Sequence, residues 1–144
     1  MTEPKFEIVE FQPKNVPAGL AAIVENGLFD KTVKNIPGWD KGTVIDALLN
    51  GGLILWVVFQ GEEPQGVLIL QPVSYPKGNA INVFAIAGHS ARDGWMRPAQ
   101  ERLEEVAKER GFDWIEGWSI PAVARVLSRQ LGYNIIRHLV VKPV

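Results

Sequence analysis

The chain contains no cysteine among its 144 residues. Disulfide bonds, thiolate metal sites and a cysteine nucleophile are therefore excluded. Histidine is scarce as well, because His89 and His138 are the only two in the sequence. Neither belongs to an HExxH pattern or to any other metal-ligand spacing, so we expect no metal site.

Long apolar runs and an excess of positive charge are also missing. The longest apolar run, residues 53–59, is far too short to cross a bilayer, and residues 1–5 are polar and lack the apolar core of a signal peptide. Fifteen basic residues against 16 acidic ones give a formal charge of −1, with no basic stripe. We expect a cytoplasmic protein that binds neither a membrane nor nucleic acid.

What remains is the composition of an ordinary globular protein. Hydrophobic residues make up 47% of the chain and charged residues 22%, which is enough to bury a core of normal size. The length favours one domain spanning residues 1–144. We find no repeat, linker or low-complexity segment that would divide it.

Strand and helix patterns alternate along the chain and predict an α/β domain. Strands are expected at residues 6–11, 53–60, 67–73, 80–87, 113–119 and 134–141. The second is apolar throughout and is therefore expected to be covered on both faces. Pro72 is expected to interrupt pairing of the third strand, because proline cannot donate to a ladder.

Helices are predicted between these strands. Asn15 is expected to cap the first, with Pro17 in its first turn and Gly27 dividing it from a second short helix. Residues 43–50 form another, which Gly51 and the preceding asparagine end. The clearest helix follows residue 94 and ends at Gly111, with one apolar face made of Met96, Ala99, Leu103, Val106 and Ala107. A further helix starts near residue 119.

The most informative stretch is residues 80–133. An apolar strand leads into a loop containing Gly88 and Gly94, and the loop delivers the chain to the start of the amphipathic helix. Unpaired N–H groups and the positive end of the helix dipole meet at such a point. That arrangement suits the phosphates of a nucleotide-like cofactor.

The order strand, loop, helix, strand, helix and then a Gly-aromatic pair resembles the GNAT superfamily of N-acetyltransferases. Family members often read Asn-x-x-Ala-x-x-x-Tyr-x-x-x-Gly-Phe in the last helix, where this chain has Pro121, Ala124, Ser128 and Gly132-Tyr133. The resemblance implies a single-domain fold with a central, mixed but mainly antiparallel sheet and about four helices. It also places Ser128 where a family tyrosine often protonates the departing CoA thiolate.

The resemblance assigns the cofactor loop as well, and implies acetyl-CoA as the cofactor. The family pattern Arg/Gln-x-x-Gly-x-Gly/Ala falls on residues 91–96, where only Gly94 keeps its register and Met96 replaces a very small residue. Asp93 would add negative charge to the anion site, and Arg92 could offset it. In the family a backbone N–H of the preceding strand binds the acetyl oxygen. The implied cofactor-binding residues are thus Phe84, Ala85, Ile86, Arg92, Asp93, Gly94, Trp95, Met96 and Arg97.

Three side chains are candidates for proton transfer. Glu116 is the candidate general base, since flanking Trp114 and Trp118 would desolvate its carboxylate and raise its pKa. His89, beside the expected cofactor mouth, is a candidate proton relay. Ser128 is the candidate acid. The plain alternatives are a solvated strand glutamate, a surface-loop histidine and an ordinary helix serine.

Two functions follow from the resemblance. The first is an N-acetyltransferase that moves an acyl group from acetyl-CoA to a small-molecule amine or a protein amine. The second is a GNAT-like domain without catalysis, working as a binding or assembly module such as a bacterial or phage accessory protein. A binder of another nucleotide or acyl carrier is a third reading. Whether the protein is a monomer or a homodimer stays open.

Overall fold

The computed structural model describes residues 5–34, 36, 38–89 and 94–117. Their centre is a five-stranded sheet in the order β1-β2-β3-β4-β5. Its strands are β1 (Phe6–Phe11), β2 (Ile54–Gln60), β3 (Glu63–Tyr75), β4 (Gly78–Gly88) and β5 (Trp114–Gly117). The pairs β1–β2, β2–β3 and β3–β4 are antiparallel, and β5 pairs parallel with β4. The predicted mixed, mainly antiparallel sheet is confirmed.

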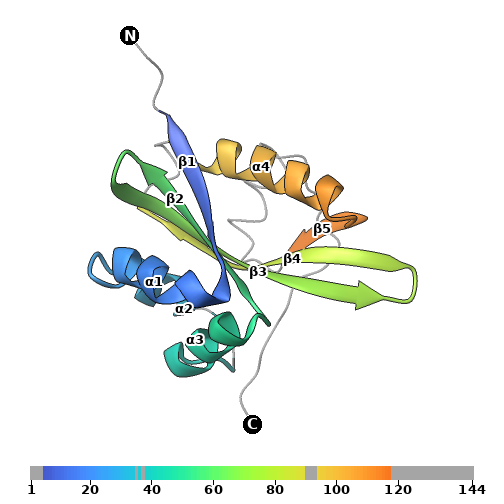
Figure 1. The fold of residues 1–144 in the computed structure, drawn as a ribbon, viewed down its shortest axis with the longest axis horizontal. Coiled ribbons are helices and arrows are strands. Elements are labelled where there is room, and N and C mark those ends of the chain that lie inside the picture. The colour runs from blue at the N-terminus through green and yellow to red at the C-terminus, as the bar shows by residue number, and fades with distance from the viewer. Residues whose placement is uncertain (1–4, 35, 37, 90–93, 118–144) are drawn as a thin grey trace.

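Helices cover both faces of this sheet (Figure 1). One face carries α1 (Val16–Val24), α2 (Leu28–Val33) and α3 (Lys41–Asn50), preceded by the 3-10 turn η1 (Pro13–Asn15). The other face carries α4 (Met96–Glu109). Among the described residues no helix is both long and apolar enough to cross a membrane.

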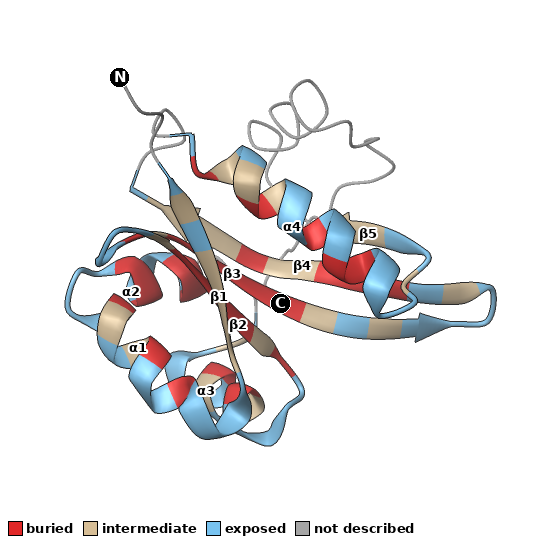
Figure 2. Cartoon of the chain, turned by 45° about the horizontal axis from the view of Figure 1, so that its top comes forward, coloured by how far each residue is buried: buried red, intermediate tan, exposed pale blue. Residues whose placement is uncertain are grey.

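The core is divided into two apolar layers by the sheet. Alternation along β2 sends Leu55 and Val57 to the layer under α1–α3, and Trp56 and Val58 to the layer under α4. All four are at most 1% exposed, which confirms that β2 is covered on both faces. Figure 2 shows the buried residues of the helices turned toward the sheet on each side.

Local sequence signals explain most of the helix boundaries. Gly27 adopts φ 79°, a left-handed conformation that ends α1 and admits α2, as predicted. Pro17 lies in the first turn of α1, but the side chain of Asn15 forms no capping bond, so that part of the prediction is wrong. The start of α3 lies two residues earlier than expected, because Asp40 and Thr43 form a reciprocal capping box.

The predicted interruption at Pro72 is also wrong. Pro72 pairs with Ile81 in an unbroken part of the β3–β4 ladder, and β3 continues to Tyr75. The ladder between β2 and β3 ends at Leu70, so a proline two residues later removes no hydrogen bond on that side. The β3–β4 hairpin therefore extends beyond the rest of the sheet (Figure 1).

Candidate functional site

A bulge interrupts β4 at Phe84. Ile69 of β3 pairs with Ala85, and the next residue, Leu70, pairs with Val83, so Phe84 has no register partner. A bulge places two successive residues on one face of the strand. Phe84 and Ala85 both pack into the layer under α1–α3, and the ring of Trp39 meets that of Phe84 edge-on at a centroid distance of 5.0 Å.

The description of β5 ends beside this bulge, at Gly117. The parallel ladder with β4 runs from the pair Ala80 and Trp114 to the pair Val83 and Gly117. Beyond that pair β4 continues from Phe84 to Gly88, which we call the end segment of β4. In the chain, this segment separates the bulge from the residues that precede α4.

Helix α4 begins close to the end segment of β4. Its N-cap residue, Trp95, is 3% exposed, and its indole covers the paired glycines Gly66 and Gly88. A Cβ on Gly66 would lie 2.6 Å from the indole carbon Cε3, while the atoms nearest to Gly88 are Cζ2, Cε2 and Nε1. No side-chain hydrogen bond caps α4, and its first turn contains no acidic residue. The start of α4 therefore suits an anion.

Glu116 lies on β5 directly opposite Asn82 of β4. Its carboxylate is half-buried and accepts a 2.6 Å hydrogen bond from the hydroxyl of Tyr75. Trp114 stacks on Tyr75 with a centroid distance of 5.6 Å and an interplanar angle of 26°. The predicted neighbourhood of Glu116 thus contains one indole and a phenol, whereas Trp118 lies outside the described residues.

The other predicted residues are distributed unevenly around these elements. Phe84, Ala85 and Ile86 lie in the end segment of β4. Met96 and Arg97 lie in the first turn of α4, directly after Gly94 and Trp95. Arg92, Asp93 and Ser128 lie outside the described residues, as do the motif positions from 121 onward.

His89 and Glu116 are not brought together. His89 is exposed just past the end of β4, where its backbone N–H donates to the carbonyl of Gln65. Glu116 lies at the level of Asn82, seven residues back along β4. At about 3.3 Å per residue the two are roughly 20 Å apart along the strand. His89 therefore lies past the end segment of β4, whereas Glu116 lies beside the part of β4 that precedes the bulge.

Sequence reasoning did not identify Tyr75 or Asn82. Tyr75 lies between the strands expected at residues 67–73 and 80–87, and Asn82 is the single polar residue inside an otherwise apolar strand. That isolated asparagine was the available signal, because a polar side chain in a buried strand needs a partner. Only the strand register brings these two residues to Glu116.

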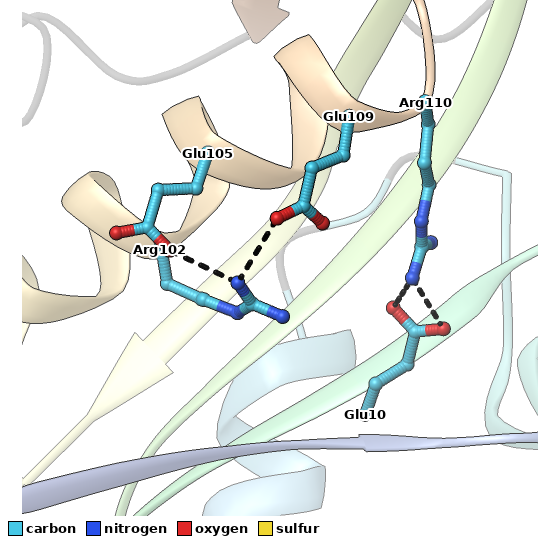
Figure 3. Close-up of polar contacts among 5 residues, drawn as sticks. All are labelled: Glu10, Arg102, Glu105, Glu109 and Arg110. Atoms are coloured by element: carbon cyan, nitrogen blue, oxygen red, sulfur yellow. Dashed lines mark hydrogen bonds and ion pairs between the residues drawn. The ribbon is translucent and has the colours of Figure 1, made fainter.

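A separate cavity of about 200 Å³ lies between β1 and α4, lined by Ile8, Glu10, Gln12, Trp56, Arg102, Val106 and Arg110. Figure 3 shows how its charged groups are paired. Glu10 accepts hydrogen bonds from Arg110 at 2.9 and 3.0 Å and from the indole of Trp56 at 2.8 Å. Arg102 bonds to Glu105 of its own helix at 3.0 Å. The contacts of Glu10 join β1 and β2 to the end of α4.

Comparison with known proteins gives a consistent fold. No protein-family model and no curated protein matches the sequence. Among solved structures, an aminoglycoside acetyltransferase from an uncultured soil metagenomic sample is 18% identical, with a TM-score of 0.72 over 97% of this chain and 99% of that one.

Two further acetyltransferases of known structure are similar over nearly their whole length. The ribosomal-protein-alanine N-acetyltransferase from Brucella melitensis biovar Abortus 2308 is 14% identical, with a TM-score of 0.68 over 97% of this chain and all of that one. A predicted acetyltransferase with acetyl-CoA from Clostridium acetobutylicum is 15% identical, with a TM-score of 0.65 over 96% of each chain. The chain therefore has the GNAT fold, as the sequence resemblance implied.

Proposed function

We propose that the protein is an N-acyltransferase that moves an acetyl group from acetyl-CoA to an amine. The observation that carries this proposal is the bulge at Phe84 together with the end segment of β4 that follows it. This segment approaches the start of α4, where Trp95 packs on Gly88. The shared fold of the acetyltransferases described above supports the same activity.

The residues present fit the proposed cofactor at two points. Residues 84–86 lie at and just beyond the bulge of β4, where one of their backbone N–H groups would bind the acetyl oxygen as it gains charge. The N-terminus of α4, with no acidic residue in its first turn, would hold phosphate. The thioester of acetyl-CoA supplies an acyl carbon that an unprotonated amine attacks, with release of the thiol.

Glu116 is the residue that would take the proton from the amine. It lies on β5 opposite Asn82, two residues before the bulge at Phe84. Tyr75 holds one carboxylate oxygen, Oε1, by its 2.6 Å hydrogen bond and so fixes the orientation of the group. A carboxylate in this position is suited to act as a general base.

A non-catalytic GNAT-like module is the alternative, and one observation favours it. Met96 occupies the first position of α4, where the family has a very small residue, and its side chain packs against the core. A long side chain there would restrict the approach of backbone N–H groups to a pyrophosphate. Such a protein would keep the fold for binding or assembly without acetyl transfer.

Thermal unfolding with and without acetyl-CoA separates the two readings. A ligand at a hundred times its dissociation constant stabilises the folded state by about 2.7 kcal/mol, which raises the melting temperature of a domain of this size by roughly 5–10 °C. We expect this shift with acetyl-CoA at micromolar affinity and no shift with ATP at the same concentration. An unchanged melting temperature at millimolar acetyl-CoA would exclude the enzyme and leave the binding module.

A further inference from the structure

A lysine of α2 contacts the last residue of β4. The ammonium group of Lys31 donates a hydrogen bond from Nζ to the carbonyl oxygen of Gly88 at 2.8 Å. The two residues are 57 positions apart in the chain, so the contact is produced by the fold and not by a local turn. Because Gly88 ends β4, this bond joins α2 directly to the end segment of β4.

The peptide group between Gly88 and His89 is held on both sides. Its N–H, which belongs to His89, donates to the carbonyl of Gln65 on β3 at 3.1 Å. The peptide bonds of the described residues are all trans, and the C=O and N–H of a planar trans peptide group point in opposite directions. The Gly88 carbonyl is therefore directed away from β3, and Lys31 supplies its donor on that side.

The packing around Gly88 makes an external restraint useful. The indole of Trp95 fills the space that a Cβ would need, so only glycine fits here. Glycine, however, leaves its backbone more conformational freedom than any other residue. Helix α4, which begins after Trp95, and helix α2 lie on opposite faces of the sheet (Figure 1). The last residue of β4 is thus held by one side chain from each helix layer.

The position of Lys31 is fixed by the helix that carries it. Helix α2 is anchored in the fold by its buried residues, Leu28, Phe29, Thr32 and Val33. The residue before the lysine, Asp30, pairs with Lys41 of α3. In the part of the chain that the structure describes, no carboxylate forms an ion pair with Lys31. Its ammonium therefore donates to Gly88 as a charged group, and such hydrogen bonds are stronger than neutral ones.

We propose that Lys31 is a positioning residue of the proposed cofactor site. Its hydrogen bond to Gly88 holds the end segment of β4 in the orientation that binds acetyl-CoA. In the chain, Gly88 lies between the two points proposed to contact the cofactor, residues 84–86 and the start of α4. A segment that is ordered before binding loses less freedom when the ligand binds, which raises affinity. The inference rests on the proposed function, because it adds a residue to the same site.

Three single variants test this role by their affinity for acetyl-CoA, measured by isothermal titration. Lys31→Met removes the donor, Lys31→Arg keeps one, and Lys34→Met removes the same charge from another exposed position on α2. We expect affinity about tenfold weaker in Lys31→Met, and affinity close to that of the wild type in the other two. In turnover the loss should raise the KM for acetyl-CoA and leave kcat nearly unchanged. Wild-type affinity in Lys31→Met, or an equal loss in Lys34→Met, would overturn the proposal.

Amide exchange of the free protein gives a second readout that needs no cofactor. In Lys31→Met the amide of His89, which bonds to Gln65, should exchange about threefold faster or more, because its peptide group is released on one side. Amides of residues 80–83 should keep their rates, and the melting temperature should change little because Lys31 is exposed. An unchanged rate at His89 would show that Lys31 does not restrain this peptide and would overturn the inference.

The two proposals fail in different ways. A wild-type protein that does not bind acetyl-CoA would remove the acyltransferase, and with it the role of Lys31 in the cofactor site. Binding by the wild type that is equally tight in Lys31→Met would keep the cofactor site and remove only the positioning role.

Discussion

The indole of Trp95 occupies the space that a side chain at Gly88 would need. Gly88 ends β4, and Trp95 is the N-cap residue of α4. Their close approach, with Gly66 beside them, fixes the position of the start of α4 relative to the end segment of β4. The glycine is thus required by packing, not by an unusual backbone angle.

Gly88→Ala should therefore destabilise the fold. The added methyl group would overlap the buried indole, and overpacking of this kind costs about 1–3 kcal/mol. Urea unfolding measures the effect. Gly42→Ala is the matched control, because that glycine lies in the exposed first turn of α3, where Oδ1 of Asp40 would be 3.4 Å from the new Cβ. A loss at Gly88 no larger than at Gly42 would contradict the packing described here.

Glu116→Gln tests the proposed general base. The amide still accepts the hydrogen bond from Tyr75, so the melting temperature should change little, while turnover should fall about a hundredfold or more because the amine loses its proton acceptor. Steady-state release of CoA with an amine acceptor measures this loss. Glu104→Gln, at an exposed position on α4, should keep full activity. Full activity in the Glu116 variant would remove the base assignment.

Met96→Gly tests whether the first residue of α4 restricts the cofactor loop. If the thioether blocks close approach of a pyrophosphate, its removal should create or tighten CoA binding, measured by isothermal titration. Some stability should be lost as well, because Met96 packs against the core under α4. Met96→Ala separates the effect of the smaller side chain from the flexibility of glycine. Unchanged affinity in both variants would show that the loop assignment is wrong.

The capping box at Asp40 predicts a dependence of stability on pH. The backbone N–H of Thr43, and then its hydroxyl, hold the pKa of the Asp40 carboxyl below its ordinary value of 3.8. The charged carboxylate therefore stabilises the fold above pH 3.8, and this contribution is lost as the pH falls through the lowered pKa. Asp40→Asn keeps a capping oxygen but does not titrate in this range.

Unfolding of the wild type and of Asp40→Asn should thus be compared from pH 6 down to pH 2. We expect a constant difference in free energy of unfolding at the upper end, and a decrease of the wild type relative to the variant below pH 3.8. Parallel curves over the whole range would show that the Asp40 carboxylate makes no pH-dependent contribution.

Much of the fold could be predicted from the sequence because periodicity carries it. The apolar face of α4, the double-sided burial of β2 and the division at Gly27 follow from residue spacing, and each is confirmed. The family resemblance supplied the order of the elements, and the shared fold of the solved acetyltransferases agrees with it. Boundaries that depend on a single side chain, such as the start of α3 at Asp40, were less well placed.

The candidate site was harder to predict, since it depends on strand register. Nothing in the apolar run of residues 80–87 marks Phe84 as the bulged residue, because neighbouring positions are equally suited to a buried strand. Tyr75 meets Glu116 only because the β3–β4 hairpin extends past Pro72. Asn82 was visible as a polar residue, but its neighbours on β3 and β5 could not be known from spacing.

The end segment of β4, Phe84 to Gly88, is the part of the fold on which the proposed activity depends, and amide hydrogen exchange with and without acetyl-CoA tests its role most directly. We predict that amides among residues 84–88 exchange more slowly when acetyl-CoA is present. Residues 80–83, already paired with β5, should not change. Identical exchange with and without acetyl-CoA throughout residues 84–88 would contradict the assignment of this segment to the cofactor site.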